Sequence, residues 1–191
     1  EGSLFDVPAV GLREEREETR RTLNERCEAA AALIEDADHA VSWCHLNDES
    51  ALLTKIIDGA VEVAGSESPD AKEEKLQAFS NGEIRVLVTK PSIGAWGLNW
   101  QHCHRMTYFP SHSYEQMYQA TRRLWRFGQK NPVTVDIVTT EGGRNVVANL
   151  QRKSAQADAM FDALVAHMNN AMAIDQHTYQ TEIEVPAWLA S

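Results

Sequence analysis

Apolar runs alternate along the chain with longer segments in which apolar residues recur every three or four positions. The runs without helix or strand breakers predict five strands, at 39–43, 60–63, 84–89, 105–109 and 133–139. The clearest of them is 84–89, whose sequence IRVLVT is β-branched and nearly continuous. A strand of this kind is typical of a parallel sheet that is covered on both faces.

The segments between these strands have helical periodicity and suitable capping residues. They predict helices from Arg13 onward, then at 47–57, 69–79, 114–123 and 145–172. In the last helix an apolar stripe is expected to belong to a core; its members are Leu150, Ala157, Phe161, Leu164 and Met168.

Strands that alternate with helices predict an α/β fold, with a parallel sheet, right-handed crossovers and helices on both faces. Long N- and C-terminal helices are expected to flank the sheet. We therefore expect an N-terminal helical extension over 1–37, an α/β domain over 38–141 and a C-terminal helical extension over 142–191.

Composition narrows the possible partners. The 191 residues are 43% hydrophobic and 24% charged, with a formal net charge of −10. That charge argues against a chain that coats nucleic acid through bulk electrostatics, so any DNA contact needs a local basic or amide-lined surface. The start, Glu1-Gly2-Ser3, resembles no signal peptide and has no initiator methionine, which suggests a piece of a longer protein. No apolar run is long enough for a membrane span.

The three cysteines, Cys27, Cys44 and Cys103, are odd in number and widely spaced. This favours reduced intracellular thiols over a disulfide framework or a zinc site. The segment Gln101-His102-Cys103-His104 invites a metal interpretation, but an extended backbone would place Cys103 on the face opposite both histidines. A structural role is therefore expected there, and no metal site is predicted.

A glycine-containing turn follows the clearest strand, with the sequence TKPSIGAWGLNW at 89–100. Ligands of parallel α/β sheets bind at the carboxyl ends of strands, and glycines allow close backbone approach. The turn alone is weak evidence, because the chain contains neither G-x-G-x-x-G nor G-x-x-x-x-G-K-[ST]. A turn that only packs helix on strand is an open alternative. Trp100 is expected in the core, whereas Trp96 is left open between the core and stacking on DNA.

An arginine-rich segment, QATRRLWRFGQ at 119–129, stands out in an otherwise acidic chain. On a continuous helix Arg122 and Arg126 share a face, and Arg123 and Arg126 can also converge. The planar guanidinium group matches phosphate oxygens, so such a pair suits a transferring phosphoryl group. A solvated helix face is the alternative, but two interleaved aromatics, Trp125 and Phe127, fit it poorly.

These two segments resemble motifs V and VI of Swi/Snf-type superfamily-two helicases. The motif VI pattern Q-A-x-x-R-x-x-R-x-G-Q is matched at Gln119, Ala120, Arg123, Arg126, Gly128 and Gln129. Motif V is matched at 94–99 and motif IV at 40–44, so the resemblance covers roughly 38–138. It departs from the family at Ala95, where a second glycine is common, and at Lys90-Pro91-Ser92. The resemblance is nearest to helicase-like proteins of bacteria and phages, and it implies the second RecA-like lobe of a DNA helicase or translocase in the cytoplasm.

The resemblance also implies roles for individual residues. Arg123 and Arg126 would be catalytic arginine fingers, positioned by Gln119. Three residues would bind ATP or couple its state to the DNA: Gly97, Asn99 and Gln129. Four would contact the DNA backbone without reading sequence: Thr89, Lys90, Ser92 and Trp96.

ATP and Mg²⁺ would be shared with a first RecA-like lobe, because the Walker A lysine and the Asp-Glu box do not occur in this sequence. We therefore expect the isolated chain to be inactive. A non-catalytic DNA-docking or assembly module remains the alternative. A Rossmann-type enzyme such as a methyltransferase is a poor candidate without its glycine fingerprint.

Overall fold

The computed structural model describes residues 11, 16–93 and 98–175, with side chains up to residue 166. The chain divides into two compact units, Glu1–Leu150 and Gln151–Ser191. The first unit contains a five-stranded parallel sheet in the order β2-β3-β1-β4-β5. Its strands are β1 (Ala40–Trp43), β2 (Ala60–Val63), β3 (Val86–Thr89), β4 (Arg105–Tyr108) and β5 (Thr134–Ile137). All five predicted strands are confirmed, and the α/β fold with them.

The helices also match the prediction, with ends shifted by a few residues. They are α2 (Leu23–Leu33), α3 (Asn47–Ile56), α4 (Pro69–Ser80), α5 (Tyr114–Leu124) and α6 (Arg144–Asp175), with a 3₁₀ turn at Glu141–Gly143. Residues 16–21 are helical as well. Serine caps start two helices: the Ser68 hydroxyl accepts a hydrogen bond from the Ala71 amide, and the Ser113 hydroxyl accepts one from the Gln116 amide.

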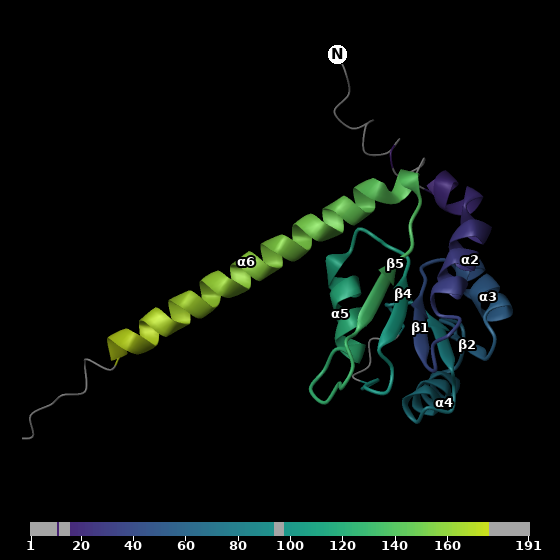
Figure 1. The fold of residues 1–191 in the computed structure, drawn as a ribbon, viewed down its shortest axis with the longest axis horizontal. Coiled ribbons are helices and arrows are strands. Elements are labelled where there is room, and N and C mark those ends of the chain that lie inside the picture. The colour runs from purple at the N-terminus through teal and green to yellow at the C-terminus, as the bar shows by residue number, and fades with distance from the viewer. Residues whose placement is uncertain (1–10, 12–15, 94–97, 176–191) are drawn as a thin grey trace, which may run out of the picture. The chain divides into compact units, whose positions relative to one another are not determined.

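Helices cover both faces of the sheet (Figure 1). On one face α2 and α3 pack with a core that includes Ile34, Ala40 and Leu53. On the other face α4 and α5 pack with a core that includes Phe79 and Trp100. The expected burial of Trp100 is confirmed.

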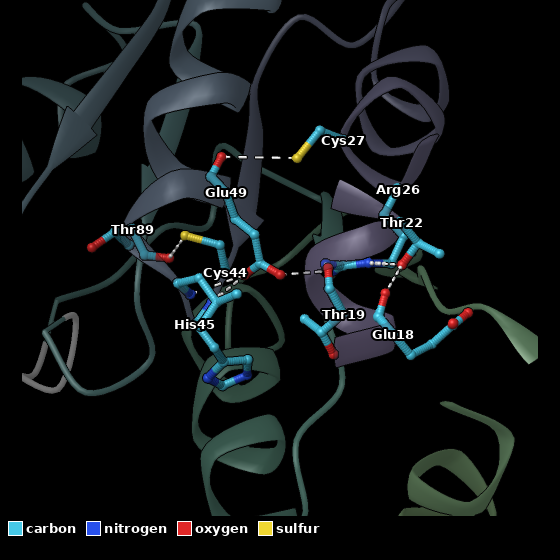
Figure 2. Close-up of polar contacts among 10 residues, drawn as sticks. Glu18, Thr19, Thr22, Arg26, Cys27, Cys44, His45, Glu49 and Thr89 are labelled. Atoms are coloured by element: carbon cyan, nitrogen blue, oxygen red, sulfur yellow. Dashed lines mark hydrogen bonds and ion pairs between the residues drawn. The ribbon is translucent and has the colours of Figure 1, made fainter. Parts of the chain in front are cut away.

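The N-terminal helix α2 is anchored to the sheet domain through a buried ion pair. Arg26 Nη1 lies 2.7 Å from Glu49 Oε1, and both side chains are almost fully buried. The second carboxylate oxygen of Glu49 accepts hydrogen bonds from the backbone amides of His45 and Leu46, at 2.9 and 3.0 Å. One buried carboxylate therefore ties α2 to the turn between β1 and α3 (Figure 2).

The apolar stripe of α6 departs from the prediction. Leu150 is buried in the first unit, but Phe161 and Leu164 in the second unit are 65% and 54% exposed. The expectation that these two side chains belong to a core is therefore wrong. Helical periodicity produces an apolar face, but burial also needs a second surface to pack on it. The side chain of Met168 lies outside the described residues. No described helix is both long and apolar enough to cross a membrane.

Candidate functional site

Helix α5 carries the predicted arginines to the edge of the sheet where β4 and β5 begin. Its N-cap, Ser113, lies just beyond the carboxyl end of β4, and the helix ends at Leu124. The chain then turns through residues 123–129, here named the arginine turn. Gly128 closes this turn with a φ of +95°, in the left-handed region that favours glycine.

Arg123 is the most enclosed cation of the arginine turn. It is 8% exposed, and its guanidinium carbon lies 5.7 Å from the centroid of the Trp100 ring. Burial, and then the neighbouring charge of Arg126, lower the pKa of the Arg123 guanidinium. No ion pair to Arg123 occurs within the described ranges. A buried cation without a carboxylate is costly, so this position is suited to receive an anion from outside the lobe.

The other two arginines of the segment are exposed. Arg122 lies over the ring of Trp125, with 5.1 Å from guanidinium carbon to centroid. Because α5 ends at Leu124, Arg126 lies beyond the helix, and the expectation that Arg122 and Arg126 share a helical face does not hold. The charge of Arg126 lowers the pKa of Arg123, so the two guanidinium groups interact although Arg126 lies beyond the helix.

The end of the motif V segment contacts the arginine turn directly. The Trp100 amide donates to the Arg123 carbonyl at 3.1 Å, and the Gln101 side chain donates to the Phe127 carbonyl. Asn99, which precedes Trp100 in the chain, is exposed. Two segments that are distant in sequence therefore form one local structure.

Gln129 braces the arginine turn from within. Its side-chain amide donates to the Cys103 and Leu124 carbonyls, at 3.0 and 3.2 Å. Gln119 is exposed on α5, and no hydrogen bond joins it to Arg123 or Arg126 in the part of the chain that is described. Its positioning role stays a prediction. Gly97 lies outside the described residues.

The residues expected to contact DNA lie at the opposite, carboxyl edge of the sheet. Thr89 is fully buried and its hydroxyl donates to the Val63 carbonyl, so its side chain serves the sheet. Lys90 Nζ lies 2.6 Å from Asn47 Oδ1, and Ser92 is exposed. Trp96 lies outside the described residues.

The structure thus separates the predicted site into two groups. Arg123, Arg126, Asn99 and Gln129 lie near the start of β4, whereas Lys90 lies just past the end of β3. A four-residue strand spans roughly 13 Å. A single phosphate therefore cannot contact both groups, and the two edges are suited to two different ligands.

The cysteines and histidines that could have formed a metal or thiol site have structural roles instead. The Cys103 thiol is buried and lies within hydrogen-bond distance of the His39 and Arg105 carbonyls, at 3.5 and 3.3 Å. The His102 ring packs edge-on against His39, at 4.9 Å between centroids. Within the described ranges no three His, Cys, Asp or Glu residues are grouped as metal ligands would be. Burial raises the pKa of the Cys44 thiol to about 12, which leaves it unreactive near neutral pH.

Sequence reasoning missed a cavity at the carboxyl edge of β1, β4 and β5. It has a volume of about 430 Å³, and its wall includes Arg16, Arg20, His45 and the segment 138–143. The charge run 13–21 is typical of a solvated helix face, so the pattern gave no reason to place its arginines around a cavity. The adjacent glycines Gly142 and Gly143 were the one available signal.

Comparison with solved structures supports the fold. The C-terminal part of the Fun30 ATPase domain aligns with a TM-score of 0.58 and 14% identity, over 65% of this chain and 44% of that one. The C-terminal domain of S. cerevisiae Dbp5 bound to Gle1 and IP6 aligns with a TM-score of 0.60 and 11% identity, over 70% and 80%. Another structure of the C-terminal domain of the DEAD-box protein Dbp5 gives 0.57 and 13%, over the same shares. This chain therefore spans less than half of the Fun30 structure.

No family model and no curated protein matches the sequence. At identities this low the structural likeness establishes the fold alone. The chain has the RecA-like fold that the C-terminal lobes of these ATPase and DEAD-box proteins share.

Proposed function

We propose that this chain is the second motor lobe of an ATP-dependent DNA helicase or translocase. Arg123 and Arg126 would extend from the arginine turn to the γ-phosphate of ATP held with Mg²⁺ on a first RecA-like lobe. Both guanidinium groups would stabilise the negative charge that develops in the transition state. The fold and the motif VI pattern support the proposal.

The observation that carries the proposal is the state of Arg123. Its guanidinium is largely buried against Trp100 and has no carboxylate partner among the described residues. An arginine that only solvates a helix face would be exposed or paired. The indole holds the guanidinium in one place before an anion arrives, so little side-chain freedom is lost on binding.

The two ends of the segment between β3 and β4 support coupling between the two edges of the sheet, while residues 94–97 lie outside the described residues. The segment that leaves β3 at Lys90 reaches the arginine turn at Trp100 and Gln101. Lys90 and Ser92 would hold DNA phosphates at the carboxyl edge without reading sequence. A shift of the arginine turn on ATP hydrolysis would then be transmitted along this segment to the DNA.

The test is DNA-stimulated ATPase activity of the complete motor, with this lobe joined to its first lobe. Arg123→Ala and Arg126→Ala are each expected to lower turnover by about 10³-fold, with ATP affinity within a few-fold of wild type. Arg122→Ala is the matched control, because it removes the same charge from the same helix end, and its turnover is expected to stay near wild type. The isolated chain is expected to hydrolyse no ATP.

The result also decides the alternative. If Arg123→Ala and Arg126→Ala turn over like wild type while DNA binding is lost, the arginines form a docking surface, and a non-catalytic DNA-binding module replaces the motor proposal. If the control loses as much activity as the two variants, the effect comes from the charge of the helix end, and the arginine-finger roles are wrong.

A further inference from the structure

The cavity at the carboxyl edge lies where the topology of the sheet favours ligand binding. Strands β1 and β4 are neighbours, but the helices that follow them cover opposite faces. Helix α3 contributes Leu53 to one core, and α5 contributes Leu124 to the other. In open α/β sheets the crevice outside two such strands is the usual position of a bound ligand.

Residues from both sides of this crevice line the cavity. The lining includes segments that follow three strands: His45, Leu46 and Glu49 after β1, residues 109–112 after β4, and residues from 138–143 after β5. The volume of about 430 Å³ is within the range of small-molecule sites. The cavity is therefore a partly open space of ligand size at the switch point, on the edge opposite the arginine turn.

The two carboxylates in the cavity wall are already neutralised. Glu49 is paired with Arg26 and accepts two backbone N–H groups as well. Glu18 is paired with Arg21 at 2.8 Å, and this hydrogen bond holds the pKa of Glu18 below its ordinary value. Neither carboxylate is left to repel an anion at close range or to bind a cation.

Of the three arginines in the wall, Arg26 is neutralised by Glu49, but Arg16 and Arg20 are not. Arg16 and Arg20 are four residues apart on one helix, are exposed, and take part in no ion pair within the described ranges. The N-terminus of α6 adds to them, since Gly143 and Val146 line the cavity and the first turn of α6 contains no acidic side chain. The Gly143 and Arg144 amides already donate to the Thr140 and Glu141 carbonyls, so the contribution of α6 is the dipole at its N-terminus, which favours an anion.

His45 is a further unsatisfied group in the same wall. Its Nε2 atom is buried and has no hydrogen-bond partner among the described residues. Figure 2 shows its ring pointing away from the Glu49 carboxylate. Burial lowers the pKa of the imidazole, so it is neutral at pH 7 and able to hydrogen-bond a ligand.

We propose that this cavity binds a small phosphate monoester or diphosphate. Arg16 and Arg20 hold the phosphate beside the N-terminus of α6, and His45 hydrogen-bonds the same ligand. The lobe therefore has a second anion site at the carboxyl edge. This inference does not rest on the motor proposal, because none of its residues belongs to the arginine turn.

The test is calorimetric titration of the 191-residue chain with inorganic phosphate, pyrophosphate and adenosine monophosphate. Binding by at least one of them is expected, and Arg16→Ala/Arg20→Ala is expected to weaken it by at least about tenfold. The matched control is Lys55→Ala/Lys130→Ala, which removes two exposed positive charges outside the cavity wall and is expected to leave the affinity unchanged. Thermal unfolding of each variant shows that the fold is retained.

Histidine-selective ¹⁵N NMR locates the bound ligand independently of the variants. Addition of the ligand is expected to shift the ring nitrogens of His45 and to leave those of His102, at the other edge, in place. The proposal is overturned if none of the three probes binds at millimolar concentration, or if the control variant loses as much affinity as Arg16→Ala/Arg20→Ala. It is also overturned if an oligonucleotide binds and the small phosphates do not, because the edge is then a DNA surface only.

Discussion

The buried ion pair between Arg26 and Glu49 gives a direct test of how α2 is held on the sheet. In Arg26→Met the apolar chain volume is largely kept, but the Glu49 carboxylate stays buried without its cation. Removing one member of a buried pair typically costs about 3–5 kcal/mol. Arg26 also donates to the Thr19 carbonyl at 2.6 Å and lies 4.9 Å from the Phe109 ring centroid, so the upper part of this range is expected.

A second substitution separates the charge from the hydrogen bonds. Arg26→Met/Glu49→Gln has no buried charge, while the glutamine carbonyl can still accept from the amides of His45 and Leu46. The double variant is therefore expected to be more stable than Arg26→Met alone, by at least about 1 kcal/mol. Two destabilising changes at independent sites would add instead.

Urea unfolding followed by circular dichroism at 25 °C measures these differences in the 191-residue chain. The control is Arg21→Met, which removes the exposed pair with Glu18 and is expected to unfold at a urea midpoint indistinguishable from wild type. The reasoning is refuted if Arg26→Met costs less than about 1 kcal/mol, or if the double variant is the less stable of the two.

Three further predictions follow from burial and backbone geometry. Burial raises the pKa of every thiol, to about 11 for Cys27 and about 12 for Cys44 and Cys103. Ellman's reagent at pH 8 is therefore expected to label none of them in the native chain and all three in guanidinium chloride. Gly128→Ala is expected to cost about 1–2 kcal/mol, because φ is +95° and the new methyl group would lie 3.1 Å from Gln101. Gly65→Ala is the control for the same urea assay, because its new methyl group would make only an ordinary van der Waals contact with Ile93, at 3.7 Å. Burial lowers the pKa of His45 and His102, so the unfolded chain binds protons first as the pH falls below 6.5. Stability is expected to fall between pH 7 and 5, and His102→Gln to flatten that fall; an unchanged slope would contradict the assignment.

The sheet and most helices could be predicted because their causes are local. The β-branched residues of β3 are enough to predict a buried parallel strand. Helix α4 begins where Ser68 supplies the N-cap and Pro69 the first helical position. The contact between the Trp100 amide and the Arg123 carbonyl, which joins the two segments that resemble motifs V and VI, was not predicted. The prediction failed where it extended local periodicity too far. Arg126 lies beyond the end of α5, and Phe161 shows that an apolar stripe can remain exposed.

Sequence by itself determined the strand and helix pattern and the parallel α/β class, since spacing and residue type are enough for these. Only the tertiary structure decided that Arg123 is buried without an acidic partner, because burial depends on Trp100, which is distant in sequence. The cavity likewise depends on long-range contacts. Arg16 and Arg20 lie at the cavity because their helix continues into α2, and Arg26 of α2 pairs with Glu49 beside the end of β1. No local sequence pattern encodes that long-range contact.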